Sequence, residues 1–273
     1  MRSQTSTARQ AVALAAVLQL ARRTRFVEPE MLGLRDLIKP GSVCFDIGAA
    51  AGLYTLAFSK LAGPDGQVHS FEPVPFAHPV LTRILGGRSS ASVRHHPVAL
   101  GVEPGRGVMS VPVGRHGPVT GRSFLDADCA GPGSNAEFRG QMDVEVEVQT
   151  LDSVCAAADL TRLDFIKIDV EGAELQVLKG GQDAIERFRP ALLVEIEDRH
   201  TARYRHPGSD VATWLRRRGY VMQIWQGSWQ ETDVVCTHAR NYLFVPGEPG
   251  ELSRPQTVAA SALSDGEELA PTG

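Results

Sequence analysis

Short apolar segments alternate along the chain with segments whose apolar residues recur at helical spacing. Runs rich in β-branched and aromatic residues predict strands, and segments with a period near 3.6 predict helices. The predicted strands span residues 42–47, 67–71, 93–99, 164–169, 191–197, 220–225 and 242–245. The predicted helices span residues 53–61, 77–85, 151–158, 173–179 and 210–218. This alternation indicates an α/β fold with a doubly wound, mostly parallel sheet covered by helices on both faces.

The regular alternation is interrupted between the third and fourth predicted strands. Residues 107–113 and 143–148 alternate between apolar and polar side chains, which predicts two extra β segments. The glycine- and proline-rich segment 114–141 joins them, and its length is typical either of a functional lid or of a disordered loop. The sequence does not decide between these two alternatives.

The two ends of the chain differ in composition from the segment between them. An apolar stretch at 11–21 is followed by Arg22 and Arg23 and is too short to cross a bilayer, so it predicts a packing helix rather than a signal peptide. The last residues contain few apolar side chains and predict a disordered tail. We therefore expect an N-terminal helical extension over 1–40, a main domain over 41–246 with an insertion at about 104–143, and a tail over 247–273.

Overall composition narrows the classes of partner. The 273 residues include 28 Lys and Arg against 32 Asp and Glu, a formal net charge of −4. Such a chain lacks the positive field that attracts DNA or RNA, so nucleic acid is not an expected partner. The four cysteines form no C-x-x-C pair, and no stable membrane insertion is expected. We expect a cytoplasmic protein with free thiols, whereas the oligomeric state cannot be read from the sequence.

The first candidate site motif follows the first predicted strand, in the sequence VCFDIGAAAGLYTLAF. Asp46 ends the strand, and Gly48 and Gly52 follow it before a helix begins. Glycines at such a turn let the backbone bend sharply and approach a ligand closely, and a carboxylate there can accept hydrogen bonds from a bound ammonium group. The motif alone is weakly specific, because a glycine after a strand often marks only a tight turn.

A second acidic residue, Glu72, ends the next predicted strand and precedes Pro73. In nucleotide-binding α/β units an acidic side chain at this place accepts hydrogen bonds from ribose hydroxyls; the alternative is a solvated turn residue. The G-x-G-x-x-G loop that binds a pyrophosphate is absent. We therefore expect a nucleoside without phosphates, S-adenosyl-L-methionine, as the cofactor. The expected cofactor-binding residues lie at or after the ends of the first three strands: Asp46, Gly48, Gly52, Glu72, Pro73 and Ala99.

The sequence FIKIDVEGAELQVLKGG supplies acidic residues at the end of a further strand. Asp169 ends this strand, and Glu171 follows two residues later. Ligands of open α/β sheets bind at the carboxyl ends of the strands, so Asp46, Glu72 and Asp169 are expected to face one crevice. Lys167, inside the strand, is expected to pair with a neighbouring carboxylate.

The next strand ends in LLVEIEDRH, which places Glu195 and His200 near the same edge of the sheet. We expect the catalytic groups among Asp169, Glu171, Glu195 and His200. His200 would serve as a general base near neutral pH, whereas Asp169 with Glu195 would suit a divalent metal ion. The absence of a tight ligand-spacing motif favours the base, and the identity of any metal is unknown. The alternative for this charged cluster is a solvated turn.

These motifs resemble one known family. The stretches DIGAAAGLYTLAF, FEPVPF, VQTLDSV, FIKIDVEGAELQVLKGG and LLVEIE are similar to the FkbM-type S-adenosylmethionine-dependent methyltransferases, over residues 42–197. The resemblance implies a class I methyltransferase domain, with a Rossmann-like sheet of seven strands of which the last is antiparallel. It also implies O-methylation of a hydroxyl on a small molecule or glycan, such as a secondary metabolite, a sugar or a glycolipid. The chain departs from the family at Ala50, where an asparagine is usual, and in the GGRSSAS segment, where the family has an asparagine late in a helix.

Three other functions are compatible with parts of this pattern. An NAD(P)-binding oxidoreductase would need the missing pyrophosphate loop. A nucleic-acid amino-methyltransferase would have a D/N/S-P-P-Y/F/W motif where this chain has IDVEG, and a cytosine-C5 enzyme would need a Pro-Cys dipeptide that does not occur. A non-catalytic module that binds S-adenosylmethionine has only the Ala50 departure in its favour. The sequence therefore predicts an O-methyltransferase with a small-molecule or glycan acceptor.

Overall fold

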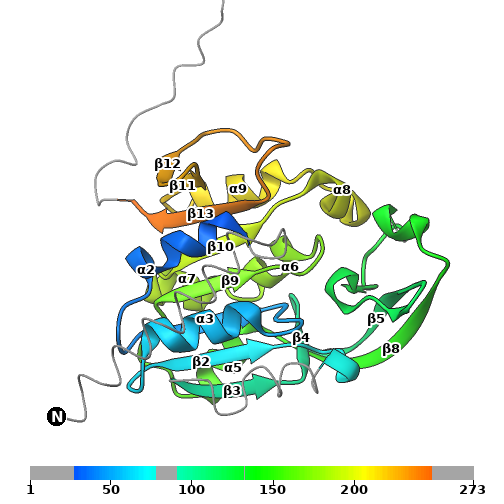
Figure 1. Ribbon diagram of the computed structural model, residues 1–273, viewed down its shortest axis with the longest axis horizontal. Coiled ribbons are helices and arrows are strands. Elements are labelled where there is room, and N and C mark those ends of the chain that lie inside the picture. The colour runs from blue at the N-terminus through cyan, green and yellow to red at the C-terminus, as the bar shows by residue number, and fades with distance from the viewer. Residues whose placement is uncertain (1–27, 78–90, 132, 248–273) are drawn as a thin grey trace, which may run out of the picture.

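The computed structural model describes residues 28–77, 91–131 and 133–247, and its centre is a twisted sheet (Figure 1). The sheet contains β1 (Val43–Ile47), β2 (Gln67–Phe71), β3 (Ser92–His96), β9 (Phe165–Ile168), β10 (Ala191–Glu195), β11 (Tyr220–Trp225), β12 (Trp229–Glu231) and β13 (Asn241–Pro246). Their order across the sheet is β12-β11-β13-β10-β9-β1-β2-β3. Five consecutive strands run parallel to one another: β10, β9, β1, β2 and β3. β13 is antiparallel to both of its neighbours, β10 and β11. The expected doubly wound, mostly parallel sheet with an antiparallel last strand is therefore confirmed.

The sheet has one strand more than the seven that were expected. Gly227, at φ +84°, lies in the turn after β11, and the chain returns as β12 to pair antiparallel along the outer edge. β12 has three residues, and all are half-buried or exposed. So short a run shows no periodicity, which explains why the sequence pattern missed it.

Helices cover both faces of the sheet. One face packs against α2 (Leu34–Leu37) and α3 (Leu53–Ala62), which contribute the buried residues Leu34, Ala57 and Phe58. The other face packs against α5 (Leu151–Ala157), α6 (Glu174–Lys179), α7 (Gln182–Phe188) and α9 (Ser209–Arg216). Because apolar helices lie on both sides, all five residues of β1 are buried.

The predicted helices outside 77–85 are present, with their ends shifted by one or two residues. Residues 78–90 lie outside the described residues, so the helix predicted over 77–85 is not described. The pattern missed α7 and also α8 (Asp198–Thr201). α8 has four residues, too few for an apolar period to emerge. α7 has seven, but only Ala184 and Ile185 among them are buried, so its apolar period is weak.

The structure contains a second, smaller sheet, and the last residues of the third predicted strand belong to it. The predicted strand 93–99 is wrong as one element: β3 ends at His96, and β4 (Val98–Leu100) pairs with β8 in the second sheet. Pro97 lies between them and has no backbone N–H to continue the ladder. The second sheet also contains β5 (Gly105–Gly114), β6 (Gly117–Pro118), β7 (Phe124–Leu125) and β8 (Gly140–Gln149). The two β segments predicted at 107–113 and 143–148 are confirmed inside β5 and β8.

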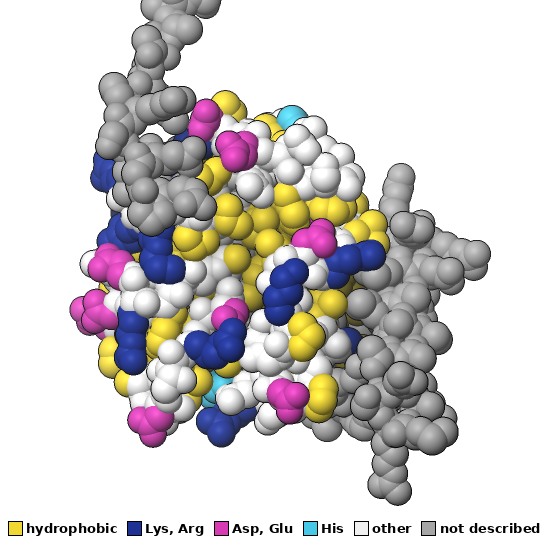
Figure 2. Space-filling view, turned by 90° about the vertical axis from the view of Figure 1, so that its left-hand side faces the viewer, with side chains coloured by type: hydrophobic (Ala, Val, Ile, Leu, Met, Phe, Trp, Pro, Cys, Tyr) yellow, Lys and Arg dark blue, Asp and Glu magenta, His cyan; other side chains and the backbone are white. Residues whose placement is uncertain are grey.

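The segment 114–141 projects with the second sheet from the carboxyl ends of the parallel strands, on the right of Figure 1. It contains β6, a 3-10 turn at Thr120–Arg122, β7 and a second 3-10 turn at Gly133–Glu137. At the other end of the parallel strands, Figure 2 shows a band of hydrophobic side chains among basic and acidic ones, so this face has charges of both signs.

The expected terminal extensions fall largely outside the described residues. Of the segment 1–40, the structure describes a 3-10 turn at Pro29–Gly33 and α2; of the tail 247–273, it describes only Gly247. Within the described ranges, every helix is too short or too polar to cross a membrane.

Candidate functional site

A cavity of about 680 Å³, counted with its opening to solvent, lies at the carboxyl ends of the parallel strands. Among the predicted site residues, those that line it are Gly48, Glu72, Pro73, Ala99, Asp169 and Glu171. The other four predicted residues, Asp46, Gly52, Glu195 and His200, do not line it. The cavity therefore brings residues from β1, β2, β4 and β9 to one place, as ligand sites of open α/β sheets require.

Gly48, in the loop after β1, lies close against the strand end of β9. Its φ is +81°, and a Cβ there would collide with the backbone carbonyl of Asp169. β1 and β9 are hydrogen-bonded neighbours in parallel register, with Ile47 opposite Ile168, so the two chain segments leave the sheet side by side. Only glycine fits this position, because a side chain would push the two strand ends apart.

Glu72 holds the loop after β1 as well as facing the cavity. Its two carboxylate oxygens accept hydrogen bonds from the backbone N–H groups of Ala50 and Val74, both at 2.8 Å. Burial raises the pKa of Glu72 to about 7, against these two hydrogen bonds, which lower it. Ala50 has φ +44°, a conformation that asparagine adopts more readily than alanine, and this is the position where the family usually has asparagine.

Asp46 lies beneath the cavity rather than in its wall. The side chain is 2% exposed, and it accepts a hydrogen bond from the hydroxyl of Thr55 in α3. Burial raises its pKa to about 6. In this structure Asp46 therefore ties the end of β1 to α3, and Thr55 is a partner that the sequence analysis did not identify.

Asp169 lies between a cation and a second carboxyl group. Lys167 in β9 is buried, and its Nζ lies 3.0 Å from Asp169 Oδ2, so the expected pairing of this lysine is confirmed. Burial raises the pKa of Asp169, but the Lys167 ammonium and a hydrogen bond with Glu195 outweigh burial and hold it below its usual value. Burial and the Asp169 charge raise the pKa of Glu195 well above its usual value. Glu195 is therefore the protonated partner and Asp169 the ionised one.

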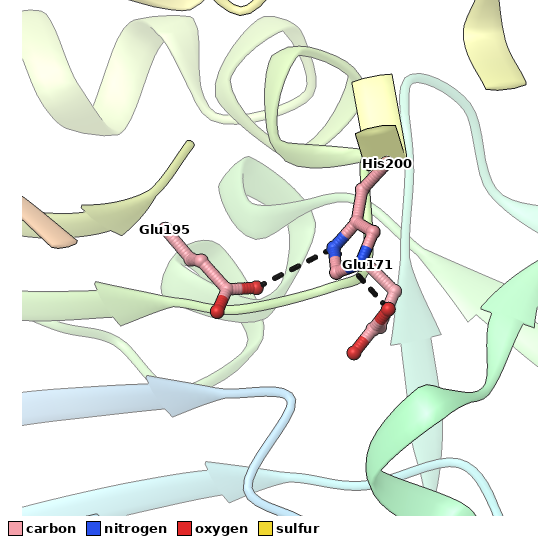
Figure 3. Close-up of side chains that lie close together, drawn as sticks. All are labelled: Glu171, Glu195 and His200. Carbon is pink, nitrogen blue, oxygen red and sulfur yellow. Dashed lines mark ion pairs between the residues drawn. The ribbon is translucent and has the colours of Figure 1, made fainter. Parts of the chain in front are cut away.

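His200 lies between the carboxyl groups of Glu171 and Glu195 (Figure 3), and of these three residues only Glu171 lines the cavity. Its Nδ1 is 3.3 Å from Glu171 Oε2 and 3.8 Å from Glu195 Oε2. Burial lowers the pKa of His200 to about 4 and raises that of Glu171 to about 8. At neutral pH the imidazole is therefore neutral, and Glu171 separates it from the cavity.

The turn that presents Glu171 is fixed by Glu174, the last residue of the DVEGAE motif. Its Oε1 accepts hydrogen bonds from the backbone N–H groups of Val170 and Gly172, at 3.2 and 3.0 Å. This anchor holds Glu171 at φ +57°, and Arg203 donates a hydrogen bond of 2.6 Å to the Glu171 carbonyl. Glu174 is a residue whose role the sequence reasoning missed, although the spacing E-x-x-E was visible in the motif.

The insertion contributes a wall of the cavity and a charged contact. Thr120, Gly121, Ser123 and Leu125 line the side opposite the strand ends. Between them, Arg122 points its Nε toward Glu171 Oε2 at 3.5 Å. No spacing rule could have linked Arg122 to Glu171, because their contact depends on how the second sheet folds back over the first.

The family model described as the methyltransferase FkbM domain matches residues 46–222. The chain is 32% identical to 31-O-demethyl-FK506 methyltransferase FkbM of Streptomyces tacrolimicus over 203 residues, which cover 68% of this chain and 75% of that protein. It is 29% identical to 2-O-methyltransferase NoeI of Sinorhizobium fredii over 156 residues, 56% of this chain and 63% of that protein.

A solved structure titled methyltransferase FkbM, from Methylobacillus flagellatus KT, is 14% identical with a TM-score of 0.44 and covers 85% of this chain and 58% of that one. The family model spans more than half of the sequence, and the order of the strands in the main sheet agrees with the arrangement that the sequence resemblance implied. The chain has the class I methyltransferase fold and belongs to the FkbM family of methyltransferases.

Proposed function

We propose that this chain transfers a methyl group from S-adenosyl-L-methionine to a hydroxyl oxygen of a small molecule or glycan. The observation that carries the proposal is that Glu72, expected to bind a ribose, and the ionised Asp169 line one cavity. Two relatives, named as a 31-O-demethyl-FK506 methyltransferase and a 2-O-methyltransferase, also support transfer to oxygen.

The residues at three strand ends fit the cofactor. Gly48 lines the cavity and lets the loop after β1 pack against the strand end of β9, and Glu72 offers a carboxylate for the ribose hydroxyls. Each carboxylate oxygen of Glu72 accepts one backbone hydrogen bond and has further lone-pair capacity for a hydroxyl. Phe71 and Val98 give the cavity apolar walls suited to a nucleobase. When bound, the cofactor would supply a methyl group on a sulfonium, which is a good leaving group.

Asp169 is the residue best placed to accept the proton of the acceptor hydroxyl. It lines the cavity, its side chain is 31% exposed, and it is ionised beside Lys167. A positioned base contributes about 10²–10⁴-fold to a proton transfer of this kind. Glu171, in the same wall, has a pKa of about 8 and is largely protonated at neutral pH, so it can donate a hydrogen bond to the acceptor.

Glu195 and His200 support this wall rather than meeting the acceptor. Glu195 shares a hydrogen bond with Asp169 and helps to keep it ionised. His200 packs behind Glu171 and is neutral, so the direct base role that the sequence favoured for it is better filled by Asp169. We assign Glu195 and His200 as positioning residues.

The acceptor is expected to be a small molecule or glycan, with its polar groups facing Thr120 and Ser123 of the insertion. The net charge of −4 argues against a nucleic-acid acceptor, because binding to DNA or RNA depends on neutralising phosphates with Lys and Arg. A cytoplasmic location is also proposed, in keeping with four free thiols.

A transfer assay with [methyl-³H]-S-adenosylmethionine tests this proposal. Sugars, glycolipid head groups and polyketides form one panel of acceptors, and tRNA and duplex DNA form a second at physiological salt. We expect label in at least one member of the first panel and none in the second. Label in nucleic acid alone would contradict the proposed acceptor class, and cofactor binding without transfer to either panel would favour a non-catalytic binding module.

A further inference from the structure

Three buried side chains from three different elements meet behind the cavity wall: Glu171 after β9, Glu195 at the end of β10 and His200 in α8 (Figure 3). One nitrogen or oxygen atom of each lies within 4.8 Å of those of the other two. We propose that these three residues form a binding site for a divalent transition-metal ion.

Several polar atoms of these three side chains have no hydrogen-bond partner among the described residues. Neither ring nitrogen of His200 makes one there, although the residue is 2% exposed. The Oε2 of Glu171 likewise makes no hydrogen bond within the described part of the chain. Polar side chains that are buried this deeply nearly always have a hydrogen-bonding partner in folded proteins. A metal ion between the ring and the two carboxylates would satisfy them together.

The spacing of the three groups suits a metal ion. Bonds of about 2.1 Å to nitrogen or oxygen place neighbouring ligand atoms roughly 3.0–3.4 Å apart in octahedral or tetrahedral geometry. His200 Nδ1 lies 3.3 Å from Glu171 Oε2 and 3.8 Å from Glu195 Oε2. Small side-chain rotations would therefore bring the three ligand atoms to bonding distance of one ion.

The chemistry of the three ligands, one imidazole and two carboxylates, determines which ion the site would prefer. Carboxylates bind Mg²⁺ and Mn²⁺, whereas an imidazole nitrogen favours Mn²⁺, Fe²⁺ and Zn²⁺ over Mg²⁺. With one histidine and two glutamates, the site is expected to prefer Mn²⁺ or Zn²⁺. Three protein ligands also leave coordination positions for water or a substrate oxygen, as in catalytic metal sites.

Two positively charged arginines lie close to the proposed site and would repel the ion. Arg122 places its Nε 3.5 Å from the same Oε2 of Glu171, and Arg203 donates a hydrogen bond to the backbone carbonyl of Glu171. Binding of the ion would displace the protons of the buried Glu171 and Glu195 carboxyl groups, and the resulting carboxylates would offset the arginine charges. Because the ion and Arg122 compete for one oxygen atom, loss of the Arg122 charge is expected to tighten metal binding.

The site is connected to the reaction through Glu171, which also lines the cavity. An ion held there would lie behind the part of the wall that Glu171 forms, and its positive charge would favour the ionised acceptor oxygen, making the hydroxyl proton easier for Asp169 to remove. This consequence rests on the proposed function, whereas binding of the metal does not. The two can therefore be tested separately.

The test is metal binding by the full chain in the absence of cofactor and acceptor. Protein treated with EDTA and dialysed free of metal is titrated with Mn²⁺, Zn²⁺ and Mg²⁺ by calorimetry, and bound Mn²⁺ is also counted by electron paramagnetic resonance. We expect one Mn²⁺ or Zn²⁺ per chain and weaker binding of Mg²⁺. His200→Ala and Glu195→Gln should weaken binding by at least about 10–100-fold, since even partners of metal ligands have effects of that size. Arg122→Gln should strengthen it.

His238→Ala is the matched control. His238 is exposed and lies outside the proposed site, with its Nε2 3.3 Å from the Cys236 sulfur. This variant should bind Mn²⁺ as the wild type does. Circular dichroism checks folding; if His200→Ala is unfolded, the near-isosteric Glu195→Gln decides.

Absence of stoichiometric binding to the wild type would overturn the inference, as would unchanged binding in folded Glu195→Gln. Methyl transfer by a chain that binds no metal would overturn the metal site and leave the proposed function standing. Metal binding without any methyl transfer would support the site and count against the proposed function.

Discussion

The carboxylate of Glu72 accepts a hydrogen bond of 2.8 Å from the backbone N–H of Ala50. One side chain at the end of β2 therefore both faces the cavity and holds the loop that follows β1. The loop has to be held, because Ala50 lies at φ +44°, a conformation that a residue other than glycine seldom keeps without an anchor. The proposed cofactor contact and the geometry of the loop consequently depend on the same carboxylate.

Glu72→Gln should weaken binding of S-adenosylmethionine and lower stability. Glutamine has one acceptor oxygen, so its amide nitrogen would face a backbone N–H and the charge-assisted bonds would be lost. Such bonds are worth about 1.5–3 kcal/mol, roughly 10–100-fold in affinity. Calorimetry and urea unfolding measure the two effects, with Glu103→Gln as the control because Glu103 is exposed. Wild-type affinity in folded Glu72→Gln would remove Glu72 from the cofactor site.

Gly48→Ala should be far more damaging than Gly41→Ala. Both glycines have nearly the same backbone conformation, with φ +81° and +82°, so the strain of placing alanine there is shared, about 1–2 kcal/mol. A Cβ at Gly41 meets nothing within 4 Å, whereas at Gly48 it collides with the carbonyl of Asp169. Unfolding midpoints in urea should therefore separate the two variants. Equal losses of stability would mean that the β1 and β9 strand ends can move apart at little cost.

Glu174→Gln should change how stability depends on pH. Burial raises the pKa of Glu174 from 4.5 to about 7, although three backbone hydrogen bonds lower it. The folded state therefore binds the proton more tightly than the unfolded state, and this stabilisation is complete below about pH 4.5 and is lost as the pH rises to about 7. At about 1.4 kcal/mol per pKa unit, the effect amounts to a few kcal/mol.

Glutamine cannot titrate, so the free energy of unfolding of the wild type should fall relative to Glu174→Gln between about pH 4.5 and 7. Urea unfolding of both proteins across this range measures the difference. A constant difference between the two curves would show that Glu174 titrates normally in the folded state.

Much of the main sheet could be predicted from local pattern. Buried parallel strands such as β1 are continuous apolar runs bounded by turns, and these features appear in a short window of sequence. The division at Pro97 could not be predicted in the same way, because whether a strand continues past a proline depends on which neighbour it then pairs with. The short elements β12 and α8 escaped because they contain too few residues to show a period.

The candidate site could also be predicted only in part. The strand ends identified Glu72 and Asp169, because parallel strands must bring their carboxyl ends together. The sequence does not show that the Asp46 carboxylate accepts a hydrogen bond from the Thr55 hydroxyl. It also does not show that His200 lies behind Glu171 rather than in the cavity wall. Those outcomes depend on side-chain direction and on the folding of the insertion that presents Arg122.

The central claim is that a methyl group passes from S-adenosylmethionine to an acceptor oxygen beside Asp169. The most direct measurement follows transfer of a CD₃ group from labelled cofactor by mass spectrometry and NMR, with wild type and Asp169→Asn compared on one acceptor. We expect one CD₃ group on an acceptor oxygen and an equal amount of S-adenosylhomocysteine. Asp169→Asn should bind the cofactor but transfer the group about 10²–10⁴-fold more slowly. Transfer at the wild-type rate by Asp169→Asn, or label on nitrogen or carbon alone, would contradict the proposed reaction.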